Sequence, residues 1–231
     1  MILLAVDTSG RQGSIALART SQSPAKGNNL LNAVEVIEVA PLAGGAFSAQ
    51  LIPHVAALLT AHGFTKNDID GFVVASGPGS FTGLRVGLAA VKALAEVLAK
   101  PIAAVSLLEA LALATRLQGR VVAAIDAGRG EVYAGEYEVN GDAATLVKEQ
   151  LLTKAEAFAN ARESVLVASD KTLSEAAMAA GISVSLVDVQ DAGSISALGW
   201  KKINAGDIVS PGNLEANYIR RTDAEILLKF S

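Results

Sequence analysis

Both halves of the chain open in the same way, with Val6-Asp7-Thr8-Ser9-Gly10-Arg11-Gln12-Gly13 in the first and Ile125-Asp126-Ala127-Gly128-Arg129-Gly130 in the second. In each stretch an apolar run ends in aspartate and is followed by a tight turn that contains glycine and arginine. A short apolar run bounded by turn residues is typical of a buried strand. The chain therefore reads as two copies of one unit, and each copy begins with a strand.

The elements that follow these openings repeat in the same order. In the first half, periodicity predicts strands over 2–6, 14–18, 34–39, 71–75 and 102–105 and helices over 49–62 and 84–99. In the second half it predicts strands over 121–125, 131–139, 144–150, 165–168 and 184–187 and helices over 154–161, 173–180 and 195–204. Ser48 and Ser194 are the expected caps of the helices that follow them.

A duplicated βββαβα order is the plan of the actin-like ATPase fold, an α/β architecture of two subdomains that is also called ASKHA or ribonuclease H-like. By analogy, we expect the first subdomain over 1–106 and the second over 107–206, with 207–231 as a candidate addition to the first. Element order alone indicates the fold and leaves the activity open.

Composition narrows the class of protein. The 231 residues contain no cysteine, which excludes thiol nucleophiles, cysteine-bound zinc and iron–sulfur clusters. Hydrophobic residues make up 51% and charged residues only 18%, and the net charge of −4 disfavours RNA binding by this chain alone. The first residues lack the basic start of a signal peptide, and the long uncharged stretch 39–65 is broken by proline and glycine. We expect a cytoplasmic protein that does not cross a membrane.

Two aspartates, Asp7 and Asp126, are the first candidates for chemistry because each ends a strand beside a glycine turn. Such a carboxylate can hold Mg²⁺ or orient a phosphate. It can equally cap its own turn by accepting backbone N–H bonds. Both interpretations remain open at this point.

A glycine-rich segment, Gly77-Pro78-Gly79-Ser80-Phe81-Thr82-Gly83-Leu84-Arg85-Val86-Gly87, lies between a strand and a helix. It lacks the Gly-Lys-Ser/Thr of a phosphate-binding P-loop and the spacing of a dinucleotide fingerprint. A helix start could still receive an anion. The alternative is steric, because Gly79, Gly83 and Gly87 recur every four residues and leave one helix face bare. The apolar residues Val91, Leu94 and Leu98 continue that face, which favours close packing or a partner interface.

The histidines do not suggest a metal site. His54 and His62 lie eight residues apart on one predicted helix, too far for the i,i+4 pair of a zinc site. Glu109 follows two leucines on a short apolar helix and is expected at the surface.

The sequence motifs indicate a protein family more clearly than they indicate a chemical reaction. The glycine-rich segment 77–87, preceded by Ile2–Asp7 and followed by Ala124–Tyr133, resembles the TsaB (YeaZ) family, and Tyr218-Ile219-Arg220-Arg221 is similar to that family's end motif. The resemblance implies an actin-like fold and a role in making N6-threonylcarbamoyladenosine at position 37 of ANN-decoding tRNAs. It also implies a non-catalytic subunit that needs no cofactor of its own.

The resemblance further implies the partners. The chain is expected to form a heterodimer with the catalytic paralogue TsaD and to work with the ATPase TsaE. When alone, it is expected to form a homodimer. It would contact tRNA only through the complex. The family's contact uses the helices over 49–62 and 84–99. The expected interface residues are Leu51, Val55, Leu58, Gly79, Gly83, Gly87, Val91 and Leu94, and the family's loops hold Asp7, Gly77, Ser80, Thr82, Arg85 and Asp126.

This chain differs from the related proteins at two places. The catalytic paralogue has a His-x-x-x-His metal pair where this chain has Leu107 and Leu111, so a metal-dependent transferase site is not expected. Phe47 stands where many family members have histidine at the start of the first long helix. The alternative to the family role is an actin-fold ATP-dependent enzyme that uses Asp7 and Asp126 around Mg-ATP.

Overall fold

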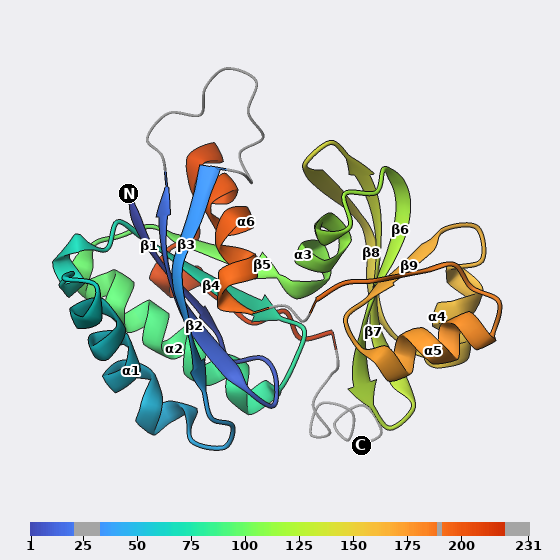
Figure 1. Ribbon diagram of the computed structural model, residues 1–231, viewed down its shortest axis with the longest axis horizontal. Coiled ribbons are helices and arrows are strands. Elements are labelled where there is room, and N and C mark those ends of the chain that lie inside the picture. Colours follow the sequence, from blue (N-terminus) through green and yellow to red (C-terminus); the bar gives the residue numbers. More distant parts are fainter. Residues whose placement is uncertain (21–32, 189–190, 220–231) are drawn as a thin grey trace, which may run out of the picture. The chain divides into compact units, whose positions relative to one another are not determined.

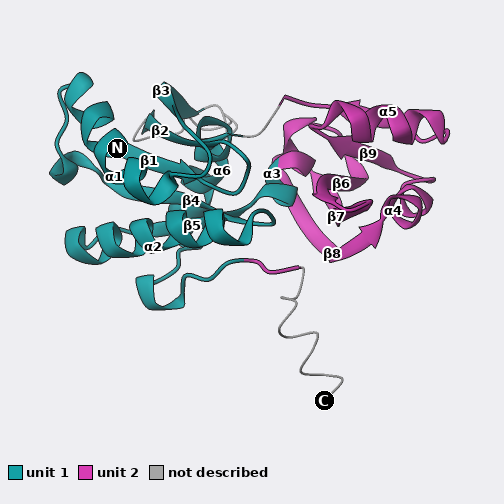
Figure 2. Cartoon of the chain, turned by 90° about the horizontal axis from the view of Figure 1, so that it is seen from below, with its two compact units in different colours: residues 1–110, 189–216 teal, residues 111–188, 217–231 magenta. Residues whose placement is uncertain are grey.

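A computed structural model describes residues 1–20, 33–188 and 191–219 (Figure 1). The chain forms two compact units (Figure 2). Unit 1 comprises Met1–Ala110 and Val189–Ala216, and unit 2 comprises Leu111–Asp188 and Asn217–Ser231.

Unit 1 is built on a five-stranded sheet of order β3-β2-β1-β4-β5. β1 pairs antiparallel with β2 and parallel with β4, so the strand that ends in Asp7 lies in the centre of the sheet. The strands are β1 (Ile2–Asp7), β2 (Gly13–Thr20), β3 (Val34–Leu42), β4 (Gly71–Gly77) and β5 (Ile102–Ser106).

Helices cover both faces of this sheet. α1 (Phe47–Ala61) and α2 (Phe81–Leu98) pack on one face, and α6 (Ala192–Ala205) packs on β1, β2, β4 and β5 from the other (Figure 1). The core between the sheet and the first two helices is apolar and almost fully buried, with Leu4, Leu17 and Phe72 at 0% exposure. The short helix α3 (Leu107–Ala114) follows β5 and contains the boundary between the units.

Unit 2 repeats the arrangement of unit 1. Its sheet has the order β10-β9-β6-β7-β8, in which the first strand again lies between an antiparallel and a parallel neighbour. The elements are β6 (Gly119–Gly128), β7 (Glu131–Asn140), β8 (Ala143–Thr153), α4 (Lys154–Asn160), β9 (Val165–Ala168), α5 (Lys171–Ala179) and β10 (Val184–Leu186). The predicted duplicated α/β fold is confirmed by this matching strand order.

The division into subdomains differs from the prediction for the last helix. α6 was expected in the second subdomain but belongs to unit 1, where Gly199 lies directly on β4. A Cβ at Gly199 would come within 2.3 Å of the Val73 side chain. Residues 207–216 also join unit 1, and Val209 forms a β-bridge with Ile102. Arg220 and Arg221 of the predicted end motif lie outside the described residues.

Two predicted helix caps are wrong in detail. α1 begins after Ala46 without a side-chain cap, so Ser48 lies inside the helix. α6 begins earlier than expected, because Asp191 accepts a hydrogen bond from the Ser194 N–H in a reciprocal capping box. Ser194 is therefore the third residue of the helix.

Glu109 is not the surface residue that the sequence predicts. Its side chain is only 19% exposed and lies 3.4 Å from the Lys202 ammonium group of α6. Burial raises the pKa of Glu109, and Lys202 opposes that shift. The pair fixes the start of α3 to unit 1.

Candidate functional site

The glycine-rich face of α2 lies against the end of β1. A Cβ at Gly83 would come within 2.0 Å of the Thr8 carbonyl oxygen, and one at Gly87 within 2.4 Å of the Thr8 hydroxyl. The Thr8 hydroxyl donates a 2.7 Å hydrogen bond to the Gly83 carbonyl, and the Ser80 N–H donates one of 2.7 Å to the Ser9 carbonyl. The chain's own residues 8–9 therefore fill the space that the glycines leave.

This packing corrects the residues predicted for the partner interface. The bare face of α2 faces inward, as do bulky residues of that set on both helices, among them Val55, Leu58 and Val91, whose exposures are 6% or less. They pack in the apolar core of unit 1. Leu51, Gly83 and Gly87 are also buried, and Gly79 and Leu94 are half-buried.

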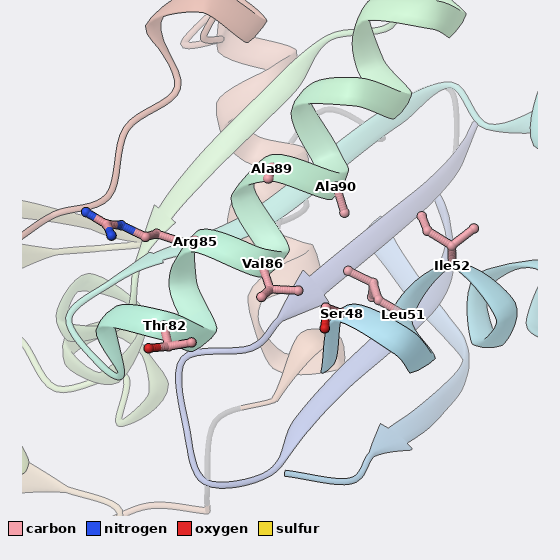
Figure 3. A pocket seen from close by; sticks show the side chains of 8 residues that line it. All are labelled: Ser48, Leu51, Ile52, Thr82, Arg85, Val86, Ala89 and Ala90. Atoms are coloured by element: carbon pink, nitrogen blue, oxygen red, sulfur yellow. The ribbon is translucent and has the colours of Figure 1, made fainter. Parts of the chain in front are cut away.

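The opposite side of α1 and α2 forms a groove of about 450 Å³ (Figure 3). Val86 of α2 points toward Leu51 of α1, and Ala90 points toward Ile52, whereas Arg85 points away from α1 (Figure 3). The groove is lined by Ser48, Leu51, Ile52, Thr82, Arg85, Val86, Ala89 and Ala90.

The exposed surface around this groove carries few charges. α1 contains no Asp, Glu, Lys or Arg, although its outer face meets solvent. On α2, the exposed charged residues are Arg85 and Glu96, and the Arg85 guanidinium stacks 3.7 Å from the centre of the Phe81 ring. We call this surface the α1–α2 face; its exposed residues are Ser48, Ala49, Ile52, Pro53, Ala56, Ala57, Thr60, Thr82, Arg85, Ala89, Ala93, Glu96 and Val97.

Asp7 is buried at the end of β1 and is engaged by its own turn. Its Oδ1 accepts hydrogen bonds from the Ser9 N–H at 2.9 Å and from the Ser9 hydroxyl at 2.6 Å. Burial raises the pKa of Asp7, the hydrogen bonds from Ser9 oppose the shift, and the charge of Asp191 adds to it. The turn-capping interpretation is thus the one that the contacts of Asp7 support.

Asp126 occupies the matching position in unit 2 but has different surroundings. Its side chain is 44% exposed, and its Oδ1 lies 3.6 Å from the ammonium group of Lys154 at the start of α4. The two aspartates therefore share a place in the repeat and differ in burial and in partner.

The remaining predicted residues are accounted for as follows. Gly77 is buried at the end of β4, and Ser80 caps α2 by accepting a hydrogen bond from the Gly83 N–H. His62 pairs with Glu38 at 2.6 Å on the surface, and His54 Nδ1 lies 2.9 Å from the Gln50 carbonyl. Leu107 and Leu111 are buried in α3, with exposures of 5% and 1%.

The described residues contain neither a metal-binding cluster nor a helix that could span a membrane. Over 1–20, 33–188 and 191–219, no three His, Asp or Glu side chains are grouped so that they could hold a metal ion. Among the helices in those ranges, none combines the length and apolar character needed to cross a bilayer.

Comparison with known proteins gives consistent matches. The profile of the TsaD family, described as tRNA N6-adenosine threonylcarbamoyltransferase, matches residues 39–213. The Bacillus subtilis tRNA threonylcarbamoyladenosine biosynthesis protein TsaB is 36% identical over 152 residues, which is 65% of this chain and 61% of that protein. The Escherichia coli protein of the same name is 42% identical over 92 residues, 38% of this chain and 40% of that protein. The matched region thus spans about half the length of these relatives.

A solved structure extends the likeness over nearly the whole chain. It is a Pseudomonas aeruginosa protein described as uncharacterized and similar to the peptidase YeaZ. It superposes with a TM-score of 0.72 at 26% identity and covers 95% of this chain and 99% of its own. This superposition covers both units and agrees with the duplicated fold described above.

Proposed function

Because this chain belongs to the TsaB (YeaZ) branch of the TsaD family, we propose that it is a non-catalytic scaffold subunit for threonylcarbamoyl transfer to adenosine 37 of ANN-decoding tRNAs. In this role it pairs with a TsaD-like paralogue that performs the transfer. A TsaE-like ATPase completes the complex, which works in the cytoplasm. The chain meets tRNA only through these partners, and without them it pairs with a second copy of itself.

The α1–α2 face is the observation that carries this proposal. Soluble proteins rarely expose contiguous surface with so few charges unless another protein covers it. The groove offers Ile52, Val86 and Ala90 as an apolar centre, and small residues such as Ala89 allow a partner helix to approach closely. The helices are those expected from the family resemblance, with the contact moved to their outer sides.

The chemistry of α3 supports the non-catalytic part of the proposal. Leucine side chains have no donor atom for a metal ion, and Leu107 and Leu111 instead fill buried space. Glu109, between them in sequence, is paired with Lys202. This helix therefore supports packing at the position where the catalytic paralogue carries its histidine pair.

A pair of variants tests the docking face. Ile52→Lys places a charge in the groove, whereas Leu186→Lys places one at a residue of unit 2 with nearly equal exposure, 50% against 49%. We expect Ile52→Lys to abolish pairing with the TsaD-like paralogue in size-exclusion chromatography and to abolish tRNA modification in the reconstituted system, because an unpaired buried charge is strongly unfavourable. Leu186→Lys should pair and function normally. Full modification without this chain, or normal pairing by Ile52→Lys, would contradict the proposal.

The alternative, an ATP-dependent enzyme that uses Asp7 and Asp126, is tested separately. One oxygen of Asp7 already accepts two hydrogen bonds from Ser9, and Asp126 lies beside Lys154. Calorimetric titration of the purified chain with Mg-ATP distinguishes the two roles. Micromolar binding that is lost in Asp7→Ala would favour the enzyme, and no detectable heat is expected for the scaffold.

A further inference from the structure

The β7–β8 hairpin contains the one Asn-Gly pair of the sequence, Asn140-Gly141. Asn140 pairs with Ala143, so the loop between the strands consists of Gly141 and Asp142. Gly141 has a positive φ of +64°, and both residues of the Asn-Gly pair are exposed. Within the described part of the chain, the side chain of Asn140 makes no hydrogen bond. Its carboxamide is therefore accessible to a nucleophile.

An Asn-Gly pair contains both reactants of a backbone reaction. If the Gly141 nitrogen loses its proton, it can attack Cγ of Asn140, because glycine has no Cβ that would shield the nitrogen. A bond forms between that nitrogen and Cγ, the Cγ–Nδ2 bond breaks, and Nδ2 leaves as ammonia with the proton that Gly141 lost. Water then opens the resulting succinimide ring at one of its two carbonyl carbons, which yields aspartate or isoaspartate. The reaction starts with the loss of the Gly141 proton.

Gln118 engages the group that carries this proton. The residue lies directly before the first pair of the β6–β7 ladder, Gly119 with Val139. The Gly141 N–H donates a 2.7 Å hydrogen bond to Oε1 of Gln118, and Nε2 of Gln118 donates one of 3.4 Å to the Gly141 carbonyl oxygen. One side-chain amide therefore holds both polar backbone groups of Gly141, and we call this arrangement the Gln118 clamp.

The carboxamide of Gln118 is also fixed from its other side. Its Nε2 donates to the carbonyl oxygens of Leu117 at 3.1 Å and Arg116 at 3.4 Å. Because carbonyl oxygens accept only from the amide nitrogen, these contacts orient Oε1 toward the Gly141 N–H. An oxygen at 2.7 Å stabilises the N–H and would repel the anion that forms when the proton is lost. The clamp thus opposes the first step of the reaction.

We propose that Asn140 is a site of spontaneous deamidation and that the Gln118 clamp sets the rate of this modification. Opening of the clamp frees the Gly141 nitrogen, and the reaction proceeds from that open state. In the isoaspartate product the backbone of β7 is one carbon longer, so the pairing of residue 140 with Ala143 that closes the hairpin is lost. The inference does not depend on the proposed function, because every group involved lies in unit 2 of this chain.

The matched variants are Gln118→Ala and Gln50→Ala. Oε1 of Gln50 also accepts a backbone hydrogen bond, from the Ala43 N–H at 3.1 Å, but in unit 1. After incubation at mildly alkaline pH, mass spectrometry follows the conversion of amide to acid in the peptide that contains Asn140. Gln118→Ala should deamidate about tenfold faster than the wild type, because one hydrogen bond is lost, and Gln50→Ala should match the wild type. Equal rates for Gln118→Ala and the wild type would overturn the proposal.

Two further measurements separate the clamp from a general loss of structure. Wild-type protein unfolded in guanidinium chloride gives the rate without the clamp, and the native protein should be at least about tenfold slower. Hydrogen exchange at the Gly141 amide should be slow in the wild type and fast in Gln118→Ala, with the β6–β7 ladder protected in both. Free exchange at Gly141 in the wild type, or a ladder that loses protection in Gln118→Ala, would show that Gln118 does not act as a clamp.

Discussion

Gly83 and Thr8 lie so close together that a Cβ atom on the glycine would approach the threonine carbonyl oxygen to 2.0 Å. The Thr8 hydroxyl returns a hydrogen bond to the Gly83 carbonyl. The first turns of α2 and the end of β1 therefore form one rigid junction at the centre of unit 1. The glycine series on α2 is explained by this junction and requires no second molecule.

Gly83→Ala should destabilise the protein, because the obstructing atom belongs to the backbone and cannot rotate away. We expect a loss of about 3 kcal/mol in the free energy of unfolding, measured by urea denaturation. Gly212→Ala is the matched control, since a Cβ there meets no atom within 4 Å. Equal stability of the two variants would contradict the junction.

Val91→Asp and Ala89→Asp separate the inner and outer sides of α2. Val91 is 0% exposed in the core, so a carboxylate there should cost several kcal/mol and unfold unit 1, on the order of the cost of an unpaired buried charge. Ala89 is exposed and should tolerate the change at about 0.5 kcal/mol while pairing is lost. Circular dichroism and size-exclusion chromatography of both variants check the two outcomes.

Asp7→Asn should change how stability depends on pH. Burial raises the pKa of Asp7 above the usual value of 3.8. The folded state therefore favours the protonated side chain over the ionised one. The contribution of Asp7 is complete below pH 3.8 and is lost as the pH rises through its folded-state pKa. The asparagine variant should therefore gain stability relative to the wild type as the pH rises above 3.8. Parallel unfolding free energies across that range would show that Asp7 is not penalised.

Lys202→Met should expose the cost of burying Glu109. Burial lowers the pKa of Lys202, but the negative charges of Glu109 and Asp207 raise it by more. The pKa of Lys202 therefore lies above its usual value. Without this cation we expect a loss of about 2 kcal/mol at pH 8. The loss should be smaller at pH 5, because the pKa of Glu109 is already raised and rises further without Lys202, so protonation relieves the penalty. Urea denaturation at both pH values measures this, and adding Glu109→Gln should remove most of the pH dependence.

Much of the fold is predictable from the sequence because it depends on short-range patterns. The apolar runs before Asp7 and Asp126 mark the central strands of both sheets, and all the predicted helices occur. The last helix, α6, could not be assigned to its unit, since an apolar stripe shows that a face is buried without showing what covers it. Glu109 was misplaced for a similar reason, because Lys202 is far away in sequence.

The candidate site shows the same limit. The spacing of Gly79, Gly83 and Gly87 correctly indicates a close approach to α2, but the sequence cannot tell Thr8 and Ser9 from a partner subunit. The outer α1–α2 face has the opposite signature, a lack of charge at exposed positions, which is visible only once the buried side is known. The turn at Arg129 was expected from its glycines, whereas the positive φ of the arginine was not.

The late position of α6 has a consequence for synthesis on the ribosome. Unit 1 begins at Met1, but one face of its sheet is covered by Ala192–Ala205 and its core receives Leu214. Most of unit 2, from Leu111 to Asp188, is translated in one continuous run before those residues emerge. Unit 2 can therefore complete its sheet first, while unit 1 keeps an apolar surface exposed until its last helix has been synthesised. This is the reverse of the usual order, in which the domain that begins first also folds first.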